Sequence, residues 1–212
     1  MQSQNHKGQY PLPVSQDAIR LAARLRASST ESEKIILFTG AMAREGVSTL
    51  ATQVALALAQ IDRGAVLLLD TNLRTPSLHT TFQVQQIPGL VDLIEHKATL
   101  EDAIHPTDLP TLSLLPVGNA HGDPLRLFPT VECATLMQTL REWFRFIIVD
   151  ASPLLQYVDT TLLVPYTDGV IVAIAAGERR QAEVLEVKRV LDGLKASVIG
   201  VVLCERTRRK SR

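Results

Sequence analysis

The chain has 212 residues, enough for one ordinary α/β domain with some length left at its ends. Its 22 Lys and Arg residues balance 22 Asp and Glu residues, so the formal charge is zero and an overall basic field for nucleic acid is excluded. Hydrophobic residues make up 46% of the chain, which is too apolar for a disordered protein, while aromatic residues make up only 4%. The core must therefore consist of Leu, Val, Ile and Ala, which is typical of buried parallel strands and the helices that cover them.

The two ends of the chain differ in composition from its middle. Residues 1–15 are polar and contain no apolar core of a signal peptide, so we expect a flexible lead there. Residues 206–212 are basic and lack apolar side chains, so we expect a C-terminal tail that either contacts anionic lipid on the cytoplasmic leaflet or is solvated. No apolar run reaches the ~18 residues of a membrane span, and we therefore expect a cytoplasmic protein with one domain over residues 16–205.

Between these ends, helices alternate with apolar strands. In chain order the pattern predicts a basic amphipathic helix over 17–27, a strand over 34–38, a helix over 48–60, a strand over 65–69, short helices over 77–82, 89–95 and 100–104, a strand over 112–115, a helix over 131–143, a strand over 146–149, a short helix over 158–163, a strand over 169–175, a helix over 181–194 and a strand over 197–203. Because the strands are continuous apolar runs, we expect an α/β fold with a mostly parallel central sheet and helices on both faces. Ligands bind such sheets at the carboxyl ends of the strands, here after residues 38, 69 and 149.

The loop after the first of these strands follows the pattern of a phosphate-binding P-loop. That pattern is G/A-x-x-x-x-G-K-S/T between a strand and a helix, and residues 41–48 match it except at the lysine, which is Val47. Backbone amides of such a loop, together with the start of the helix, hold phosphate oxygens. We therefore predict that ATP or ADP is bound by Ala43, Arg44, Glu45, Gly46, Val47, Ser48 and Thr49.

The missing lysine changes what this loop is expected to do. In a P-loop the lysine contacts the β- and γ-phosphates and neutralises charge during phosphoryl transfer. A charge-assisted hydrogen bond is worth about 1.5–3 kcal/mol, so its loss should lower nucleotide affinity by roughly ten- to a hundredfold or more. We expect weak nucleotide binding without efficient phosphoryl transfer, unless Arg44 or Arg74 replaces the lysine. The alternative is that both arginines are solvated or paired with acids.

Two further apolar strands end in an aspartate, Asp70 and Asp150. P-loop enzymes use such residues to hold Mg²⁺ and its waters. A single aspartate here would be weak support, because Asp often caps the following helix. Two of them beside a P-loop-like segment favour a metal site, and we predict Asp70 and Asp150 as the catalytic acids and Ser48, Asp70 and Asp150 as the Mg²⁺ ligands.

Longer stretches of sequence around these positions resemble the motifs of a known protein family. They are Asp70-Thr-Asn-Leu-Arg-Thr-Pro76, Gly89-Leu-Val-Asp-Leu-Ile94, Leu112–Gly118 and Asp150-Ala-Ser-Pro153. In this order they are similar to Asp-Ala-Asp-Leu-Arg-Arg-Pro, Gly-Leu-Ser-Asp-Leu-Leu, Leu-x-Leu-Leu-Pro-x-Gly and Asp-Thr-Pro-Pro of the bacterial tyrosine autokinases, the cytoplasmic kinase modules of capsule and exopolysaccharide export systems. The resemblance extends over residues 18–203 and implies a P-loop NTPase-like kinase domain over residues 16–205.

The chain departs from this family at four points. Val47 replaces the lysine, Asn72 replaces the second acid of Asp-x-Asp, and Cys204 replaces an asparagine that lies near the adenine in the family. An amide such as that of Asn72 cannot act as a base. The family's C-terminal tyrosine cluster is also missing, since the only tyrosines are Tyr10, Tyr157 and Tyr166. These departures indicate a kinase fold that has lost its kinase chemistry.

The resemblance implies a function for such a degenerate member. It implies a pseudokinase-like regulator of exopolysaccharide or capsule biosynthesis that acts with a membrane polysaccharide co-polymerase at the inner face of the cell membrane. ATP or ADP and Mg²⁺ would bind only weakly, and nucleic acid is not an expected partner. Asp17-x-x-Arg20 partly matches a motif for ring assembly in the family, so a homo-oligomer is a further expectation.

Two alternatives remain open at the level of sequence. One is an active ATP-dependent protein-tyrosine autokinase with an atypical P-loop, which would need Arg44 or a partner residue in place of the lysine. The other is a partitioning or positioning ATPase, which shares the fold. Those ATPases carry an additional lysine early in the loop, where this chain has Met42.

Overall fold

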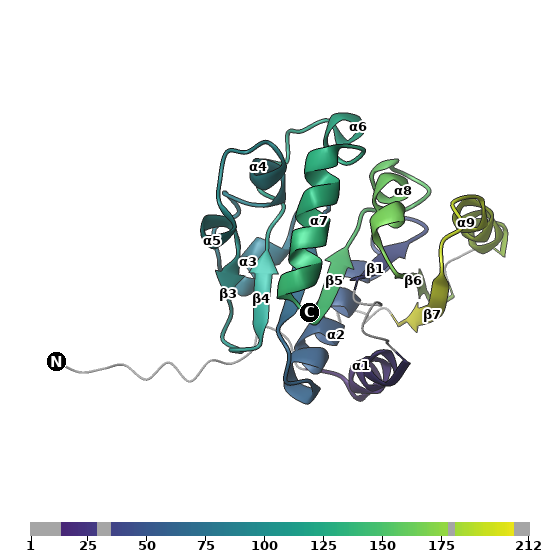
Figure 1. Ribbon diagram of the computed structural model, residues 1–212. Helices are drawn as coiled ribbons and strands as arrows, with labels where there is room; N and C mark the ends of the chain where they lie inside the picture. Colours follow the sequence, from purple (N-terminus) through teal and green to yellow (C-terminus); the bar gives the residue numbers. More distant parts are fainter. Residues whose placement is uncertain (1–13, 29–34, 178–180, 206–212) are drawn as a thin grey trace, which may run out of the picture.

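The computed structural model describes residues 14–28, 35–177 and 181–205, and within them seven strands form one sheet (Figure 1). The strand order is β3-β4-β2-β5-β1-β6-β7, and every neighbouring pair is parallel except β3 with β4. The strands are β1 (Ile35–Gly40), β2 (Val66–Asp70), β3 (His105–Pro106), β4 (Leu112–Leu115), β5 (Phe146–Asp150), β6 (Gly169–Ala175) and β7 (Val198–Cys204). This is the mostly parallel sheet that the apolar runs predict.

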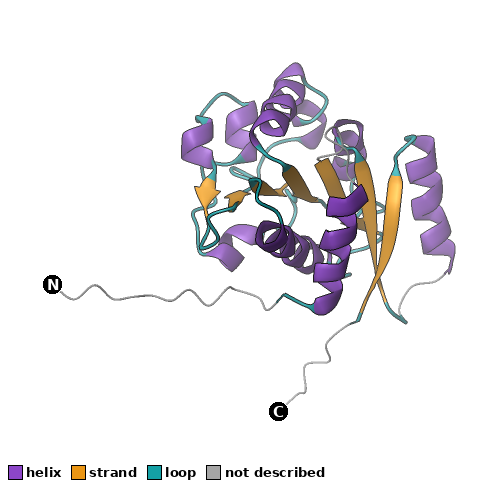
Figure 2. Ribbon diagram, turned by 60° about the horizontal axis from the view of Figure 1, so that its bottom comes forward, coloured by secondary structure: helices purple, strands orange, loops and turns teal. Residues whose placement is uncertain are grey.

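Helices cover both faces of the sheet (Figure 2). They are α1 (Gln16–Ser28), α2 (Val47–Ile61), α3 (Leu78–Phe82), α4 (Leu90–Ile94), α5 (Leu100–Ala103), α6 (Pro124–Leu127), α7 (Val131–Trp143), α8 (Asp159–Leu163), the 3₁₀ helix η1 (Val164–Tyr166) and α9 (Gln181–Gly193). Residues of α1, α2 and α3 pack in the apolar cluster on one face, and residues of α4 to α9 pack in the cluster on the other.

The central strands are buried on both sides, which explains their uninterrupted apolar sequences. In β1, Ile35 and Leu37 belong to the cluster under α7, whereas Ile36 and Phe38 belong to the cluster under α2. Every residue of β1, β2, β5 and β6 is buried. Because neither face meets water, no polar alternation is needed, and the expected α/β fold with two covered faces is confirmed.

The predicted elements are confirmed within one or two residues at their ends, and three short elements were not predicted. The strand β3 has only two residues and pairs at the sheet edge, where Pro106 can be accommodated although it has no N–H to donate. The other two are α6, which begins at an Asp123 cap followed by proline, and η1. The predicted tail over 206–212 and residues 1–13 of the predicted lead lie outside the described residues.

Among the helices of the described chain, none is both long and apolar enough to cross a bilayer. The features that matter for function lie instead at the carboxyl edge of the sheet. Asp150 at the end of β5 stands in register with Phe38 of β1 on one side and with Asp70 of β2 on the other. The loops after these three strands therefore meet at one edge, as expected from a parallel sheet.

Candidate nucleotide site

The loop between β1 and α2 has the backbone of an anion cradle. Arg44 and Gly46 both adopt the left-handed conformation, with φ of 68° and 83°. Gly46 is the N-cap residue of α2, a helix of 15 residues, and no side chain at this position bonds to the amides of the first turn. Within the described part of the chain, no hydrogen bond is donated by the amides of Arg44, Gly46, Val47, Ser48 and Thr49. Free amides at the start of a long helix attract anions, because the helix dipole adds to their partial charge.

Two side chains hold the early part of this loop in place. The Glu45 carboxylate is buried, and its Oε2 accepts a hydrogen bond from the Met42 amide at 3.0 Å. The Ala43 amide donates to Oε1 of Gln156 at 2.8 Å. A side chain on Gly40 would collide with the Glu45 carboxylate, which explains the glycine. The Glu45 side chain thus supports the loop.

Val47 stands where a P-loop has its lysine. Its side chain is only 9% exposed and belongs to the apolar cluster beneath α1 and α2. Its Cγ2 lies 3.1 Å from the place where a Cβ on Gly40 would be. The side chain therefore packs into the core behind the loop and provides no charge for a phosphate.

Asp70 and Asp150 form a buried pair of carboxylates on neighbouring strands. Asp70 accepts hydrogen bonds from the Asn72 amide at 3.0 Å and from the Leu78 amide at 3.3 Å. Burial raises the pKa of Asp70 to about 6, although these amides oppose the shift. Burial also raises the pKa of Asp150 well above its usual value, and the charge of Asp70 adds to the effect, partly offset by the nearby Ser48 hydroxyl.

The donor set at this pair suits a magnesium ion. Neither carboxylate oxygen of Asp150 has a hydrogen-bond partner of good geometry within the described residues, although the group is only 1% exposed. A buried carboxylate in this state requires a proton or a cation. Hard oxygen ligands of this kind, completed by water and phosphate oxygens, are what Mg²⁺ prefers. No group of three or more His, Cys, Asp and Glu side chains able to hold a metal occurs in the described ranges, so Ser48 and the phosphates of a nucleotide would have to complete the site.

The loop after β2 is fixed by a second polar network. The Asn72 side-chain oxygen accepts hydrogen bonds from the amides of Arg74 and Thr75 and from the Ser152 hydroxyl, at 3.1, 3.0 and 3.2 Å. Arg74 in turn forms an ion pair with the fully buried Asp159. Arg74 is therefore paired with an acid, and of the two candidate substitutes for the lysine only Arg44 makes no ion pair within the described chain.

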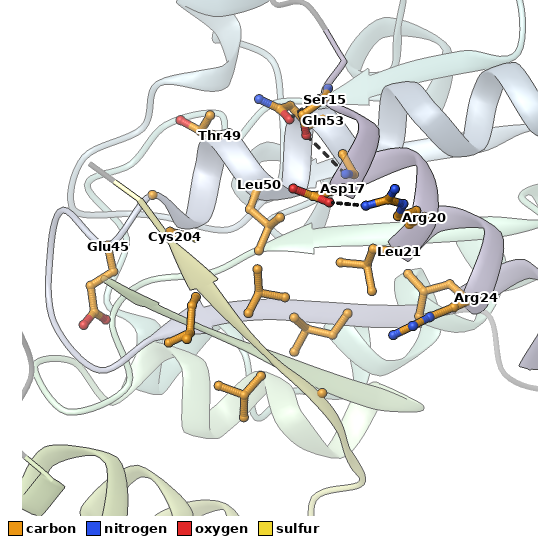
Figure 3. A pocket seen from close by; sticks show the side chains of 18 of the residues that line it. Ser15, Asp17, Arg20, Leu21, Arg24, Glu45, Thr49, Leu50, Gln53 and Cys204 are labelled. Carbon is orange, nitrogen blue, oxygen red and sulfur yellow. Dashed lines mark hydrogen bonds and ion pairs between the residues drawn. The ribbon is translucent and has the colours of Figure 1, made fainter. Parts of the chain in front are cut away.

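A cavity of about 1050 Å³ begins at the loop and runs between α1 and β7 (Figure 3). Glu45, Thr49 and Cys204 lie at one end of it, and Arg24 of α1 lies at the other. Gly46 is close to the end of β7, because a Cβ at this position would lie 3.6 Å from Cβ of Cys204. Burial and the charge of Glu45 raise the pKa of the Cys204 thiol, which keeps it neutral.

The structure brings the predicted residues together in two groups. Ser48, Asp70 and Asp150 lie on the side of the loop toward β5, whereas Arg44, Gly46 and Thr49 line the cavity toward β7. Two residues that shape the site, Gln156 and Asp159, follow β5 at positions where no sequence motif marks them. Ser152 lies within the string Asp150-Ala-Ser-Pro153, but the sequence gives it no individual role. The partners of all three residues are far away in the chain.

A phosphate-binding loop after β1 and a pair of acids on the neighbouring strands β2 and β5 define the class of P-loop NTPase-like proteins.

Comparisons with known proteins agree with this class. No family model matches the chain. However, the tyrosine-protein kinase ptk of Acinetobacter johnsonii is 32% identical over 160 residues, which are 76% of this chain. The tyrosine-protein kinase YwqD of Bacillus subtilis is 27% identical over 177 residues, which are 84% of this chain. This chain spans 22% of the Acinetobacter protein and 74% of YwqD.

Solved structures give the same result. The kinase domain of VpsO is 27% identical and superimposes with a TM-score of 0.81, over 90% of this chain and 94% of that one. The cell division ATPase MinD of Pyrococcus furiosus shares the fold, with 21% identity and a TM-score of 0.66 over 80% of this chain and 71% of that one. By sequence and by fold, the chain belongs to the family of bacterial tyrosine kinases.

Proposed function

We propose that this chain is a regulatory protein of exopolysaccharide or capsule biosynthesis that keeps the fold of a tyrosine kinase without phosphoryl transfer. The observation that carries the proposal is the position of Val47. The residue in the place of the lysine is apolar, almost fully buried and part of the core. No side chain from this position can neutralise a γ-phosphate, and that charge is needed as the phosphoryl group moves.

Asn72 supports the same conclusion. In the resembled family this position carries an acid, which can bind metal or accept the proton of a tyrosine hydroxyl. Here the amide oxygen accepts three hydrogen bonds from its own loop and from Ser152. Its nitrogen donates to Oγ1 of Thr75 at 3.2 Å. The side chain is thus used to hold the loop and has no capacity to act as a base.

A regulator without catalysis must act through binding. The resemblance supports a membrane polysaccharide co-polymerase as the partner, which would bring the protein to the inner face of the membrane. Asp17 and Arg20, the remnant of the ring-assembly motif, bond to each other at 3.1 Å on an exposed part of α1 and stay available to a second copy. Co-purification with the cytoplasmic segments of the co-polymerase tests the partner, and a mixture that elutes as two separate species would contradict it.

An active autokinase is the second candidate, favoured by one observation. The Asp70–Asp150 pair keeps a buried carboxylate that requires a proton or cation, as a working Mg²⁺ site does. When bound, Mg²⁺ would supply positive charge to the phosphates, and Ser48, Asp70 and Asp150 would hold it. A partitioning ATPase is supported only by the shared fold, and the position of its additional lysine is Met42.

The decisive experiment is a phosphotransfer assay on three proteins: the wild type, Val47→Lys, and Val47→Lys combined with Asn72→Asp. Each is incubated with γ-labelled ATP, Mg²⁺ and a tyrosine-containing peptide. We expect no labelled tyrosine with the wild type, and we expect the double variant to have the highest activity of the three. Labelling by the wild type that Asp150→Asn abolishes would establish the active kinase and refute the proposal.

A further inference from the structure

The charges around the phosphate loop are arranged asymmetrically. In the sheet order, β1 lies between β5, which carries Asp150, and β6, which leads to β7 and the cavity. The loop after β1 therefore has two buried carboxylates on one side. On the other side it has Arg44, which is one of the residues that line the cavity. The two carboxylates do not line the cavity.

The cavity has the lining that a nucleoside requires. Apolar side chains of Leu21, Leu50 and Val202 form part of its wall, and its volume of about 1050 Å³ exceeds the need of a base and a ribose. Gly46 and Thr49 are among its lining residues, so it adjoins the free amides at the start of α2. A nucleotide whose base occupies the cavity would thus lay its inner phosphates on the loop near Arg44. Any third phosphate would extend toward Asp70 and Asp150.

We infer that this site binds a nucleoside diphosphate, with Arg44 in place of the missing lysine, and that it gains no affinity from a third phosphate. The inference rests on the proposed function, because it concerns the same loop and requires that no phosphoryl group is transferred. Arg44 makes no ion pair within the described chain, so its charge is free to meet a ligand. A γ-phosphate, by contrast, would face the buried carboxylates with no cation from residue 47.

The test measures the affinity of the full chain for AMP, ADP and ATP by calorimetry, once with EDTA and once with excess Mg²⁺. We expect ADP to bind roughly tenfold or more tightly than AMP, because the second phosphate contacts the amides and Arg44. In EDTA, ATP should bind no more tightly than ADP, since its third phosphate is repelled. Mg²⁺ should help ATP more than ADP, without making ATP the stronger ligand.

Two arginine variants distinguish the contribution of the Arg44 charge to ADP affinity from that of the backbone amides of the loop. Arg44→Gly removes the guanidinium but suits the positive φ, so the fold should be as stable as the wild type. Its affinity for ADP should fall by roughly ten- to a hundredfold, the range for a lost charge-assisted hydrogen bond. Arg189→Ala is the control, because Arg189 is an exposed arginine of α9 that does not line the cavity, and ADP binding should change by less than about threefold.

Three results would overturn the inference. They are the absence of ADP binding at millimolar concentration, ATP binding clearly tighter than ADP in the Mg²⁺ buffer, and unchanged ADP affinity in Arg44→Gly. Each of these leaves the loss of phosphoryl transfer intact, because that proposal is tested by labelled tyrosine. Labelled tyrosine from the wild type would refute the proposed function, and the inference would fall with it.

Discussion

Arg74 and Asp159 form a bidentate ion pair that joins the loop after β2 to the first residue of α8. Nε and Nη2 of Arg74 donate to Oδ2 and Oδ1 of Asp159, at 3.0 and 2.9 Å. The hydrogen bonds to Asp159 are the main reason that the pKa of Arg74 is raised further. The guanidinium carbon also lies 5.0 Å from the centre of the Tyr157 ring. A cation held in this way positions the loop and is not free to reach a phosphate.

Removal of Arg74 should therefore affect stability. Arg74→Ala leaves the buried carboxylate of Asp159 without its partner, and we expect a loss of about 2–3 kcal/mol in the free energy of unfolding. The value lies below that of a fully buried pair because the Arg74 side chain is 38% exposed. Urea denaturation checks it. Arg189→Ala, which removes an exposed pair with Glu186, should cost less than about 0.5 kcal/mol, and equal losses in both variants would contradict the assignment.

Asn72 is expected to stabilise the loop in the same way. Asn72→Ala removes the acceptor of three hydrogen bonds, including one from the buried Ser152, and should lower the free energy of unfolding by about 2 kcal/mol. Thr139→Ala, which removes one exposed hydroxyl that donates to the Thr135 carbonyl oxygen within α7, should cost clearly less. Urea denaturation of both variants at pH 7.5 makes the comparison. Equal losses would show that the carbonyl oxygen does not hold the loop.

The raised pKa values of Asp70 and Asp150 predict how the stability of the folded protein depends on pH. A carboxyl group with a raised pKa holds more protons in the folded than in the unfolded chain, so its contribution to stability is lost as the pH rises above the ordinary value of ~4. For Asp70 this window runs from 3.8 to about 6. For Asp150 the pKa is raised in the same direction by burial and by Asp70, so the sign is the same.

Asp150→Asn should therefore be more stable than the wild type at pH 8 without metal. The expected increase in melting temperature is about 3 °C or more, which corresponds to ~1 kcal/mol in a domain of this size. The difference should shrink toward pH 4, where the wild-type carboxyl group is protonated. Thermal melts from pH 4 to 8 measure it. A variant that is less stable than the wild type throughout this range would show that Asp150 is compensated in another way.

With Mg²⁺ bound, the wild type should become more stable than Asp150→Asn. Mg²⁺ at ten times its dissociation constant stabilises the protein that binds it by about 1.4 kcal/mol. We expect the melting temperature of the wild type to rise with MgCl₂ in EDTA-free buffer that contains ADP, while that of Asp150→Asn in the same buffer stays nearly constant. KCl at the same ionic strength controls for screening of surface charge. An equal response of both proteins to MgCl₂ would place the ion elsewhere.

The sequence predicts the central parts of the fold well, because those parts depend on local patterns. The strand over 146–149 and the helix over 131–143 are found as β5 and α7, since a long apolar or periodic run has only one stable place in a two-faced sheet. The two-residue strand β3 is too short for any pattern. Its pairing depends on the nearness of β4 and not on its own residues.

The motifs predict which residues of the candidate site lie together, but they do not predict the side-chain contacts that hold them. The motifs place Ser48, Asp70 and Asp150 at one edge of the sheet, and register confirms that the two aspartates are neighbours. The sequence does not reveal that the Glu45 carboxylate turns into the loop or that Arg74 meets Asp159, 85 residues further along. Both contacts depend on how side chains pack after the chain has folded, and no spacing rule encodes them.

The replacement of lysine by Val47 is the center of the proposed loss of kinase chemistry, and ATP affinity tests it most directly. Calorimetry with ATP and excess Mg²⁺ should give a dissociation constant at least about tenfold lower for Val47→Lys than for the wild type, because the new ammonium group can meet the β- and γ-phosphates. ADP should gain less, since it lacks the γ-phosphate. Equal ATP affinities of wild type and variant would contradict the claim that residue 47 determines what this loop can bind.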